Sequence, residues 1–180
     1  QGSLLDIDHG SYPFVTSSNS TIGGALTGTG LVPSDINNTI GIFKAYSTRV
    51  GEGPFPSEID KLDDIAKHLL EKGHEFGTTT GRERRCGWFD MQSAKHSIMT
   101  NGFNKIAIMK LDVLDGLKEI KVLVEDKNYN ALPGWSESTF GATTYNDLPA
   151  NAKNYLEYLE ENLKVKIYMV STGPERNQTI

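Results

Sequence analysis

Apolar residues recur in two patterns along this 180-residue chain: short runs or alternations, and stripes at helical spacing. The short segments are typical of strands. The stripes repeat every three or four residues, which predicts amphipathic helices with one face in the core. The predicted strands cover 40–46, 106–109, 119–125 and 165–170. The predicted helices cover 57–73, 90–101 and 149–163. Because strands and helices alternate, we expect an α/β fold whose sheet is covered by helices.

The first predicted helix has the clearest boundary signals. Ser57 follows a proline and has Asp60 three residues later, as in a capping box, and Gly73 marks the end. Asp90 and Asp147 are expected to cap the second and third helices. The apolar stripe of the first helix is interpreted as core and consists of Ile59, Leu62, Ile65, Ala66, Leu69 and Leu70.

The N-terminal part of the chain shows neither pattern and is rich in Gly, Ser, Thr and Asn, which favours turns and short strands. Asp6, Asp8 and His9 suggest a metal site, but no further ligand follows at a workable spacing. Gln1 and Thr16 are better candidates, as neutral donors and acceptors for a nucleotide. Both ends of the sequence stop abruptly, so we expect a piece of a longer polypeptide.

Composition narrows the class of protein. Hydrophobic residues make up 37% and charged residues 23% of the chain, as in ordinary globular domains. The net charge of -5 argues against a general nucleic-acid partner. No apolar run approaches the roughly 18 residues that span a bilayer. The single cysteine, Cys86, cannot form an internal disulfide, which favours the cytoplasm, and it has no neighbouring histidine to make it a nucleophile.

Residues 77–90 contain the most informative chemistry. Consecutive threonines lie between glycines, and arginines follow. Hydroxyls and glycine amides surround small anions, and a guanidinium matches the planar geometry of carboxylate or phosphate. The segment therefore predicts a loop that holds a negatively charged small molecule. The alternative is a solvated basic loop or a weak nucleic-acid patch.

Two further polar motifs, 110–112 and 171–174, follow predicted strands, where ligands bind in open α/β sheets. Asp112 can accept hydrogen bonds from the ring N–H and the amine of guanine, whereas adenine would leave the carboxylate unpaired. The stem of Lys110 can lie across the flat base. Hydroxyls and amides of the second motif can close the other side of a base pocket, although an ordinary turn explains it equally well.

Taken in order, these phrases resemble the adenylosuccinate synthetase family over nearly the whole chain. The matching phrases are QGSLLDIDHG (1–10), YPFVTSSN (12–19), KAYSTRVGEGPFP (44–56), GTTTGR (77–82), KLDVLDG (110–116), LPGW (132–135) and STGP (171–174). The resemblance implies that residues 1–180 are the C-terminal part of such an enzyme. The implied fold is part of a P-loop-NTPase-like sheet with flanking helices.

The implied reaction joins inosine monophosphate (IMP) and L-aspartate into adenylosuccinate, with GTP converted to GDP and phosphate, in AMP biosynthesis. The base oxygen is first phosphorylated, and the aspartate amine then displaces phosphate. Magnesium is the implied cofactor, with GTP as co-substrate. A cytoplasmic homodimer is also implied, with no nucleic-acid or membrane partner.

The resemblance also implies roles for individual residues. An aspartate loop spans 77–85, and guanine-binding segments span 110–112 and 171–173. The implied IMP contacts are Gln1, Thr16 and Arg82. The implied aspartate contacts are Val50, Thr78, Thr79, Thr80, Gly81, Arg82, Glu83 and Arg84. The implied GTP contacts are Arg84, Lys110, Leu111, Asp112, Ser171, Thr172 and Gly173.

The sequence also departs from the family pattern. The family's glycine-rich phosphate loop, catalytic aspartate, catalytic histidine and magnesium ligands belong to the amino-terminal half and are not in this sequence, so no catalytic residue is assigned here. The connection from Glu125 to Leu132 is shorter than the family's. We therefore expect this piece to be inactive alone. The alternatives are a non-catalytic guanine-nucleotide-binding module and, less well supported, a small regulatory GTPase.

Overall fold

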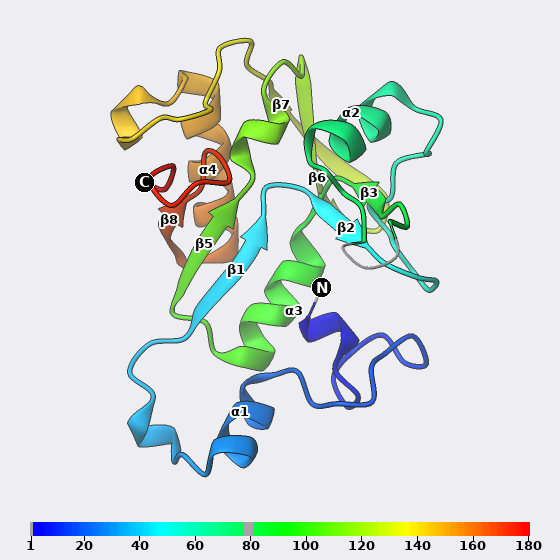
Figure 1. Cartoon of the computed structure of the whole chain (residues 1–180), viewed down its shortest axis with the longest axis vertical. Coiled ribbons are helices and arrows are strands. Elements are labelled where there is room, and N and C mark those ends of the chain that lie inside the picture. The colour runs from blue at the N-terminus through cyan, green and yellow to red at the C-terminus, as the bar shows by residue number, and fades with distance from the viewer. Residues whose placement is uncertain (1, 78–80) are drawn as a thin grey trace.

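The computed structural model describes residues 2–77 and 81–180. Its central element is a parallel sheet in the order β1-β5-β8, which confirms three predicted strands (Figure 1). The strands are β1 (Ile40–Lys44), β5 (Lys105–Met109) and β8 (Lys166–Val170). The centre of β5 is fully buried at Ile106, Ala107 and Ile108, as expected of a middle strand covered on both faces. Parallel pairing places all three carboxyl ends at one edge of the sheet.

Two smaller sheets lie beside the parallel one. The first has the order β4-β6-β7 and contains the predicted strand 119–125; the second is an antiparallel pair of β2 and β3. Their bounds are β2 (Ser47–Arg49), β3 (Arg85–Gly87), β4 (Phe89–Asp90), β6 (Glu119–Glu125) and β7 (Asn128–Pro133). The hairpin of β6 and β7 closes the short connection after Glu125, with Lys127 in the left-handed region at φ 62°. The strands β2, β3 and β4 were not predicted, because two or three residues are too few to show a period, and β7 was not predicted either, since Asn128, Asn130 and Pro133 are poor strand formers.

Helices cover the sheets on several sides, and α4 lies behind β5 and β8 in Figure 1. The α-helices are α1 (Ile22–Thr29), α2 (Asp64–Lys72), α3 (Met91–Asn101) and α4 (Ala150–Leu163). Short 3₁₀ helices cover Ser3–Leu5, Pro33–Asp35, Leu111–Leu114 and Tyr145–Asp147. The predicted cap of the second helix is confirmed, since Asp90 accepts hydrogen bonds from the backbone N–H and hydroxyl of Ser93. Among the described residues, no helix combines the length and apolar character needed to cross a membrane.

The predicted start of the first helix is wrong. The helix begins at Asp64 behind Asp63, whose carboxylate accepts from the Ile65 N–H, and it ends at Gly73 as predicted. Ser57 is instead buried in a turn next to Glu58, which pairs with Gly87, and the Ser57 carbonyl accepts from the Trp88 N–H at 2.9 Å. Tertiary pairing of this segment overrides the local capping pattern.

Three other expectations are corrected. Asp147 caps its own 3₁₀ turn through Thr144, and Pro149 precedes α4 instead. Leu62 is exposed and lies before α2, so it is not part of the core stripe. The described residues up to 39 form a helix and 3₁₀ turns, not short strands; α1 was missed because its glycines lower helix propensity.

Candidate functional site

A cavity of about 1350 Å³ opens at the edge where the parallel strands end. Lys44 ends β1, Lys110 follows β5 and Ser171 follows β8, and all three line the cavity. Asp112 and Gly173 line it as well. This is the position predicted for ligands in open α/β sheets, and the sequence motifs after β5 and β8 do meet there.

The charged lining of the cavity is mainly positive. The cationic lining residues among those described are Lys44, Arg49, Lys72, Arg84 and Lys110. The acidic ones are Asp90 and Asp112. Because the cations outnumber the carboxylates, the cavity suits an anionic ligand.

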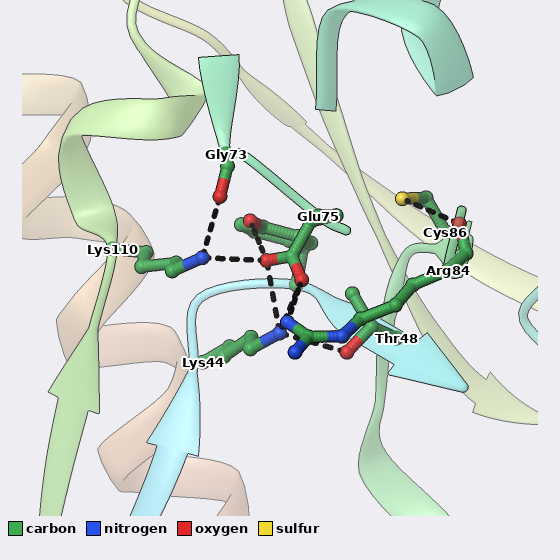
Figure 2. Close-up of polar contacts among 8 residues, drawn as sticks. Lys44, Thr48, Gly73, Glu75, Arg84, Cys86 and Lys110 are labelled. Carbon is green, nitrogen blue, oxygen red and sulfur yellow. Dashed lines mark hydrogen bonds and ion pairs between the residues drawn. The ribbon is translucent and has the colours of Figure 1, made fainter. Parts of the chain in front are cut away.

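Glu75 lies at the centre of a cluster with Lys44, Tyr46, Arg84 and Lys110, which we call the Glu75 cluster (Figure 2). Its side chain is fully buried. The carboxylate oxygens lie 2.8 Å from Lys44 Nζ, 2.8 Å from Arg84 Nη1 and 2.7 Å from Lys110 Nζ. The hydroxyl of Tyr46 donates a further hydrogen bond at 2.5 Å. The carboxylate is thus surrounded by charged donors that also face the cavity.

Local backbone structure brings Glu75 to this point. Gly73 ends α2, and His74 adopts a left-handed φ of 47°, so the chain turns back toward the interior. A Cβ at Gly73 would collide with the Tyr46 hydroxyl, so glycine is required by close approach as well. Lys110 also lies in the left-handed region, at φ 62°, and its Nζ donates to the Gly73 carbonyl at 2.6 Å.

Ionisation in the Glu75 cluster follows from these contacts. Burial opposes the charged form of Glu75, but hydrogen bonds from Lys110, Lys44, Tyr46 and Arg84 outweigh it and lower the pKa to about 2. Burial, together with the neighbouring cations, lowers the pKa of Lys44 against the opposing effect of Glu75. Burial and the contact with Glu75 raise the pKa of Tyr46, so its hydroxyl stays a donor.

Asp112 lies in the 3₁₀ turn after β5 and is half-buried in the cavity wall. Burial raises the pKa of its carboxyl group, and the nearby Asp115 raises it further, against the smaller opposing effects of the backbone and of Lys72 and Lys110. A half-buried carboxylate whose ionised form is disfavoured gains most from hydrogen-bond donors on a ligand.

The other residues of the motifs 110–112 and 171–173 lie either at the cavity or in the core. Leu111 is fully buried, and its N–H donates to the Ser171 carbonyl at 3.2 Å, which joins the two motifs. The Ser171 hydroxyl donates to the Gly173 carbonyl at 2.8 Å. Thr172 is fully buried, and its hydroxyl points to the carbonyls of Ala142 and Gln178. Ser171 and Gly173 therefore border the cavity, whereas Leu111 and Thr172 hold its wall together.

Only part of the predicted aspartate loop lines the cavity among the described residues. Val50 and Arg84 line it, whereas Thr16, Arg82 and Glu83 are exposed and lie outside its described lining. The exposed Gly81 has a φ of 63°, and its N–H donates to the Gly77 carbonyl. The structure thus brings Arg84 and Asp112 to one cavity, but not Arg82. Gln1, Thr78, Thr79 and Thr80 lie outside the described residues, and the ligand roles of all these positions stay predictions.

Two alternative chemistries find no support in the geometry. Asp6 is buried and accepts backbone hydrogen bonds from Asp8, His9, Ser20 and Thr21; these outweigh burial and lower its pKa. Within the described parts of the chain, no group of three or more His, Cys, Asp or Glu side chains is arranged to hold a metal ion. Burial raises the pKa of the Cys86 thiol to about 11, which disfavours a nucleophilic thiolate.

Sequence reasoning missed Lys44, Arg49 and Glu75. Lys44 ends a strand that the apolar run from Ile40 predicted, the same kind of position as that of Lys110, so it could have been identified. Arg49 is buried and donates to the carbonyls of Glu52 and Phe14. Glu75 carried no local signal, because a glutamate shortly after a helix is ordinary and its partners come from distant segments.

Comparison with known proteins identifies the family. A family model described as adenylosuccinate synthetase matches residues 1–128 and 124–180. The adenylosuccinate synthetase of Chromohalobacter salexigens is 50% identical over 201 residues, which include all of this chain and 46% of that protein. The one from Marinobacter nauticus shows the same identity and coverage. The chain spans about half the length of the curated relatives it matches.

Solved structures give the same result. The fully ligated adenylosuccinate synthetase from Plasmodium falciparum superposes with a TM-score of 0.93 at 38% identity, over 99% of this chain and 47% of that one. A cyanophage S-2L succinoaminodeoxyadenylate synthetase, solved with dGMP and with dATP as an energy donor, gives a TM-score of 0.65 at 20% identity. The superposition covers all of this chain and 44% of the cyanophage protein, and at this level of identity it supports a shared fold only.

Proposed function

Because this chain belongs to the adenylosuccinate synthetase family, we propose that it forms the nucleotide- and aspartate-binding part of a GTP-dependent adenylosuccinate synthase. The enzyme joins IMP and L-aspartate to give adenylosuccinate, GDP and phosphate. The proposal includes the domain assignment, with residues 1–180 as the C-terminal part, an aspartate loop at 77–85 and guanine-binding segments at 110–112 and 171–173.

The observation that carries this proposal is the shared cavity. Arg84, from the arginine-rich loop, and Asp112, after β5, line the same space of about 1350 Å³. All three substrates are anionic, and the described cationic lining is complementary to them. A carboxylate at the end of the sheet supplies what the cations cannot, an acceptor for the N–H groups of guanine.

In this proposal most residues bind one of the three substrates, and two arginines of the loop bind two. Asp112 reads the guanine ring N–H and amine, with Lys110 and Leu111 beside it and 171–173 on the other side. Arg84 contacts GTP and L-aspartate, and Arg82 contacts L-aspartate as well as IMP. Val50 borders the aspartate site, with Gly81, Glu83 and the threonines 78–80 completing it, while Gln1, Thr16 and Arg82 bind IMP.

Base selectivity has to come from side chains rather than from the fold. The cyanophage relative shares the fold and was solved with dATP as its energy donor. A guanine preference in this chain therefore rests on groups such as Asp112, whose carboxylate would be left unpaired against adenine.

Among the described residues, no group of three or more His, Cys, Asp or Glu side chains is arranged to hold a metal ion. We therefore derive no step through the metal from this chain, and we place its ligands in the part of the family that the chain does not span. The catalytic aspartate and histidine of the family belong there too. What this chain contributes is binding and orientation of the reactants, which lowers the entropic part of the barrier.

Substitution Asp112→Asn tests the base-reading role. Calorimetric titration of the chain with GTP and with ATP is expected to show GTP affinity reduced by about tenfold to a hundredfold, because an amide N–H₂ would face the guanine donors. Asp126→Asn, an exposed aspartate of the β6–β7 turn, is the matched control and should bind like the wild type. If Asp112→Asn keeps the wild-type preference for GTP over ATP, Asp112 does not read the base.

Activity is tested separately. We propose that the isolated chain makes no adenylosuccinate from IMP, L-aspartate and GTP, because it lacks the proton-transfer groups of the family. Substantial turnover by the isolated chain would contradict this. We also propose, by family, a cytoplasmic homodimer; sedimentation of the full-length enzyme as a monomer would contradict the oligomeric state.

A further inference from the structure

Glu75 joins segments that the proposed function assigns to different ligands. Arg84 belongs to the arginine-rich loop and Lys110 to the segment after β5, and both donate to the same Glu75 carboxylate. Lys44, at the end of β1, donates to it as well (Figure 2). The Glu75 carboxylate is fully buried, so dissolved salt screens its charge much less than it screens a surface carboxylate.

We propose that Glu75 is a positioning residue, which fixes Lys44, Arg84 and Lys110 in the cavity wall so that their positive charge and the remaining N–H donors of Arg84 and Lys110 face an anionic nucleotide. The inference deepens the proposed function and rests on it for the identity of that nucleotide. Glu75 itself contacts no ligand in this proposal and acts through the three cations.

The donors of the three cations are only partly used by the protein. A lysine ammonium has three donors and a guanidinium five. Lys110 donates to Glu75 and to the Gly73 carbonyl, which leaves one donor, whereas Lys44 donates to both oxygens of Glu75 and to Thr48. The Arg84 guanidinium donates from Nη1 to Glu75 at 2.8 Å. All three side chains line the cavity, and Arg84 and Lys110 keep donors for a ligand, while Lys44 adds positive charge.

Charge supports the same role. Three cations around one carboxylate leave a net charge of +2, so the cluster still attracts phosphate after Glu75 is counted. Without the carboxylate the cations would repel one another and move apart. A preorganised set of donors binds an anion more tightly than a mobile set, because the ligand does not have to order it.

Two roles of Glu75 predict opposite results. If the carboxylate only neutralised charge, removing its charge would raise the affinity for every nucleoside triphosphate. If it positions the donors, removal lowers GTP affinity and reduces the preference for GTP over ATP, since Lys110 adjoins the base-reading Asp112. Glu75→Gln separates these roles because it removes the charge and keeps the shape.

The first measurement is independent of nucleotide. Acetylation rates of Lys44 and Lys110 in the 180-residue chain are followed by mass spectrometry with an excess of an acetylating reagent. In Glu75→Gln both lysines should react about tenfold faster, because the ion pair that holds each amino group in place is lost and the reagent can reach it. The matched control is Glu58→Gln, which removes a carboxylate paired with Arg85 outside the described cavity lining and should leave both rates unchanged.

The second measurement is titration of the same proteins with GTP and with ATP. Glu75→Gln should bind GTP about tenfold more weakly than the wild type, with a smaller GTP-to-ATP ratio. Tyr46→Phe removes one hydrogen bond to Glu75 without changing any charge, and should shift GTP affinity in the same direction by about threefold. This second variant decides the question if Glu75→Gln does not fold.

Each outcome has one meaning. Faster acetylation together with weaker GTP binding supports the inference. Unchanged acetylation of Lys44 and Lys110 overturns it, and so does tighter binding of both nucleotides by Glu75→Gln. A wild-type chain that binds neither nucleotide contradicts the proposed function and the nucleotide assignment made here, while the acetylation rates still decide whether Glu75 holds the lysines.

Discussion

Glu75 and Asp115 are both buried carboxylates with several donors, but the donors differ in kind. Glu75 accepts from the three cations and Tyr46 of the Glu75 cluster, beside the cavity. Asp115 accepts from neutral groups: Trp135 Nε1 at 2.6 Å, and the N–H and hydroxyl of Thr139, each at 2.8 Å. Asp115 does not belong to the described lining of the cavity.

This difference separates a structural carboxylate from one that serves a site. The donors to Asp115 are neutral and therefore offer no positive charge to a ligand. Their hydrogen bonds connect the loop around Trp135 to the turn after β5. Charged donors satisfy Glu75 and still leave positive charge in the cavity wall. Burial alone therefore does not identify a functional acid; the charge of its partners does.

The largest effect on stability is expected at Asp115. Asp115→Ala should lower the free energy of unfolding by about 3–4 kcal/mol, because buried donors of Trp135 and Thr139 lose their acceptor. Urea unfolding measures this, with Asp126→Ala as an exposed control. Preference for GTP over ATP should persist, and its loss would break the contrast with Glu75.

Acid should affect the Glu75 cluster next. The pKa of Glu75 is about 2, below its ordinary value of 4.5, so its ionised form stabilises the folded chain above pH 4.5 and this stabilisation is lost as the pH falls toward 2. The loss should be roughly 2–3 kcal/mol. Unfolding of wild type and Glu75→Gln is compared across this range. A gap between their stabilities that stays constant from pH 6 to pH 2 would contradict the assignment.

A smaller effect is expected at Tyr46. Tyr46→Phe removes one neutral donor from Glu75 and leaves the ion pairs, so the free energy of unfolding should fall by about 1–2 kcal/mol. Thermal and urea unfolding measure it. Tyr155→Phe is a useful comparison, because its buried hydroxyl donates to the Ala45 carbonyl and not to a carboxylate. A larger loss for Tyr155→Phe would show that the charge of the acceptor does not set the strength of these bonds.

The smallest effect is expected at Glu58, whose carboxylate pairs with Arg85 at the surface. Glu58→Gln should cost less than about 1 kcal/mol, since both side chains are partly solvated and the pair is screened by salt. The difference from wild type should shrink further in high salt. A salt-independent loss as large as that at Glu75 would remove the distinction between surface and cavity ion pairs.

Regular elements were the most predictable part of the fold. The period of apolar residues predicted β1, β5, β6 and β8, and Asp90 and Gly102 bound α3 as capping rules require. Short strands such as β2 and β3 were missed because their pairing is set by distant partners: Thr48 lies opposite Cys86. The predicted start of α2 was wrong for the same reason, since the Ser57 carbonyl accepts a hydrogen bond from the distant Trp88 N–H.

The sequence by itself determined the family, the alternation of strands and helices, and the kinds of chemical group at the strand ends, because these depend on residue types in order along the chain. Only the tertiary structure decided that Arg84 and Asp112 share a cavity, that Leu111 and Thr172 support its wall, and that Glu75 connects the cations. The physical reason is that a buried carboxylate acquires its role from donors brought together by folding. No spacing along the chain from Lys44 to Lys110 indicates that they meet at one acid.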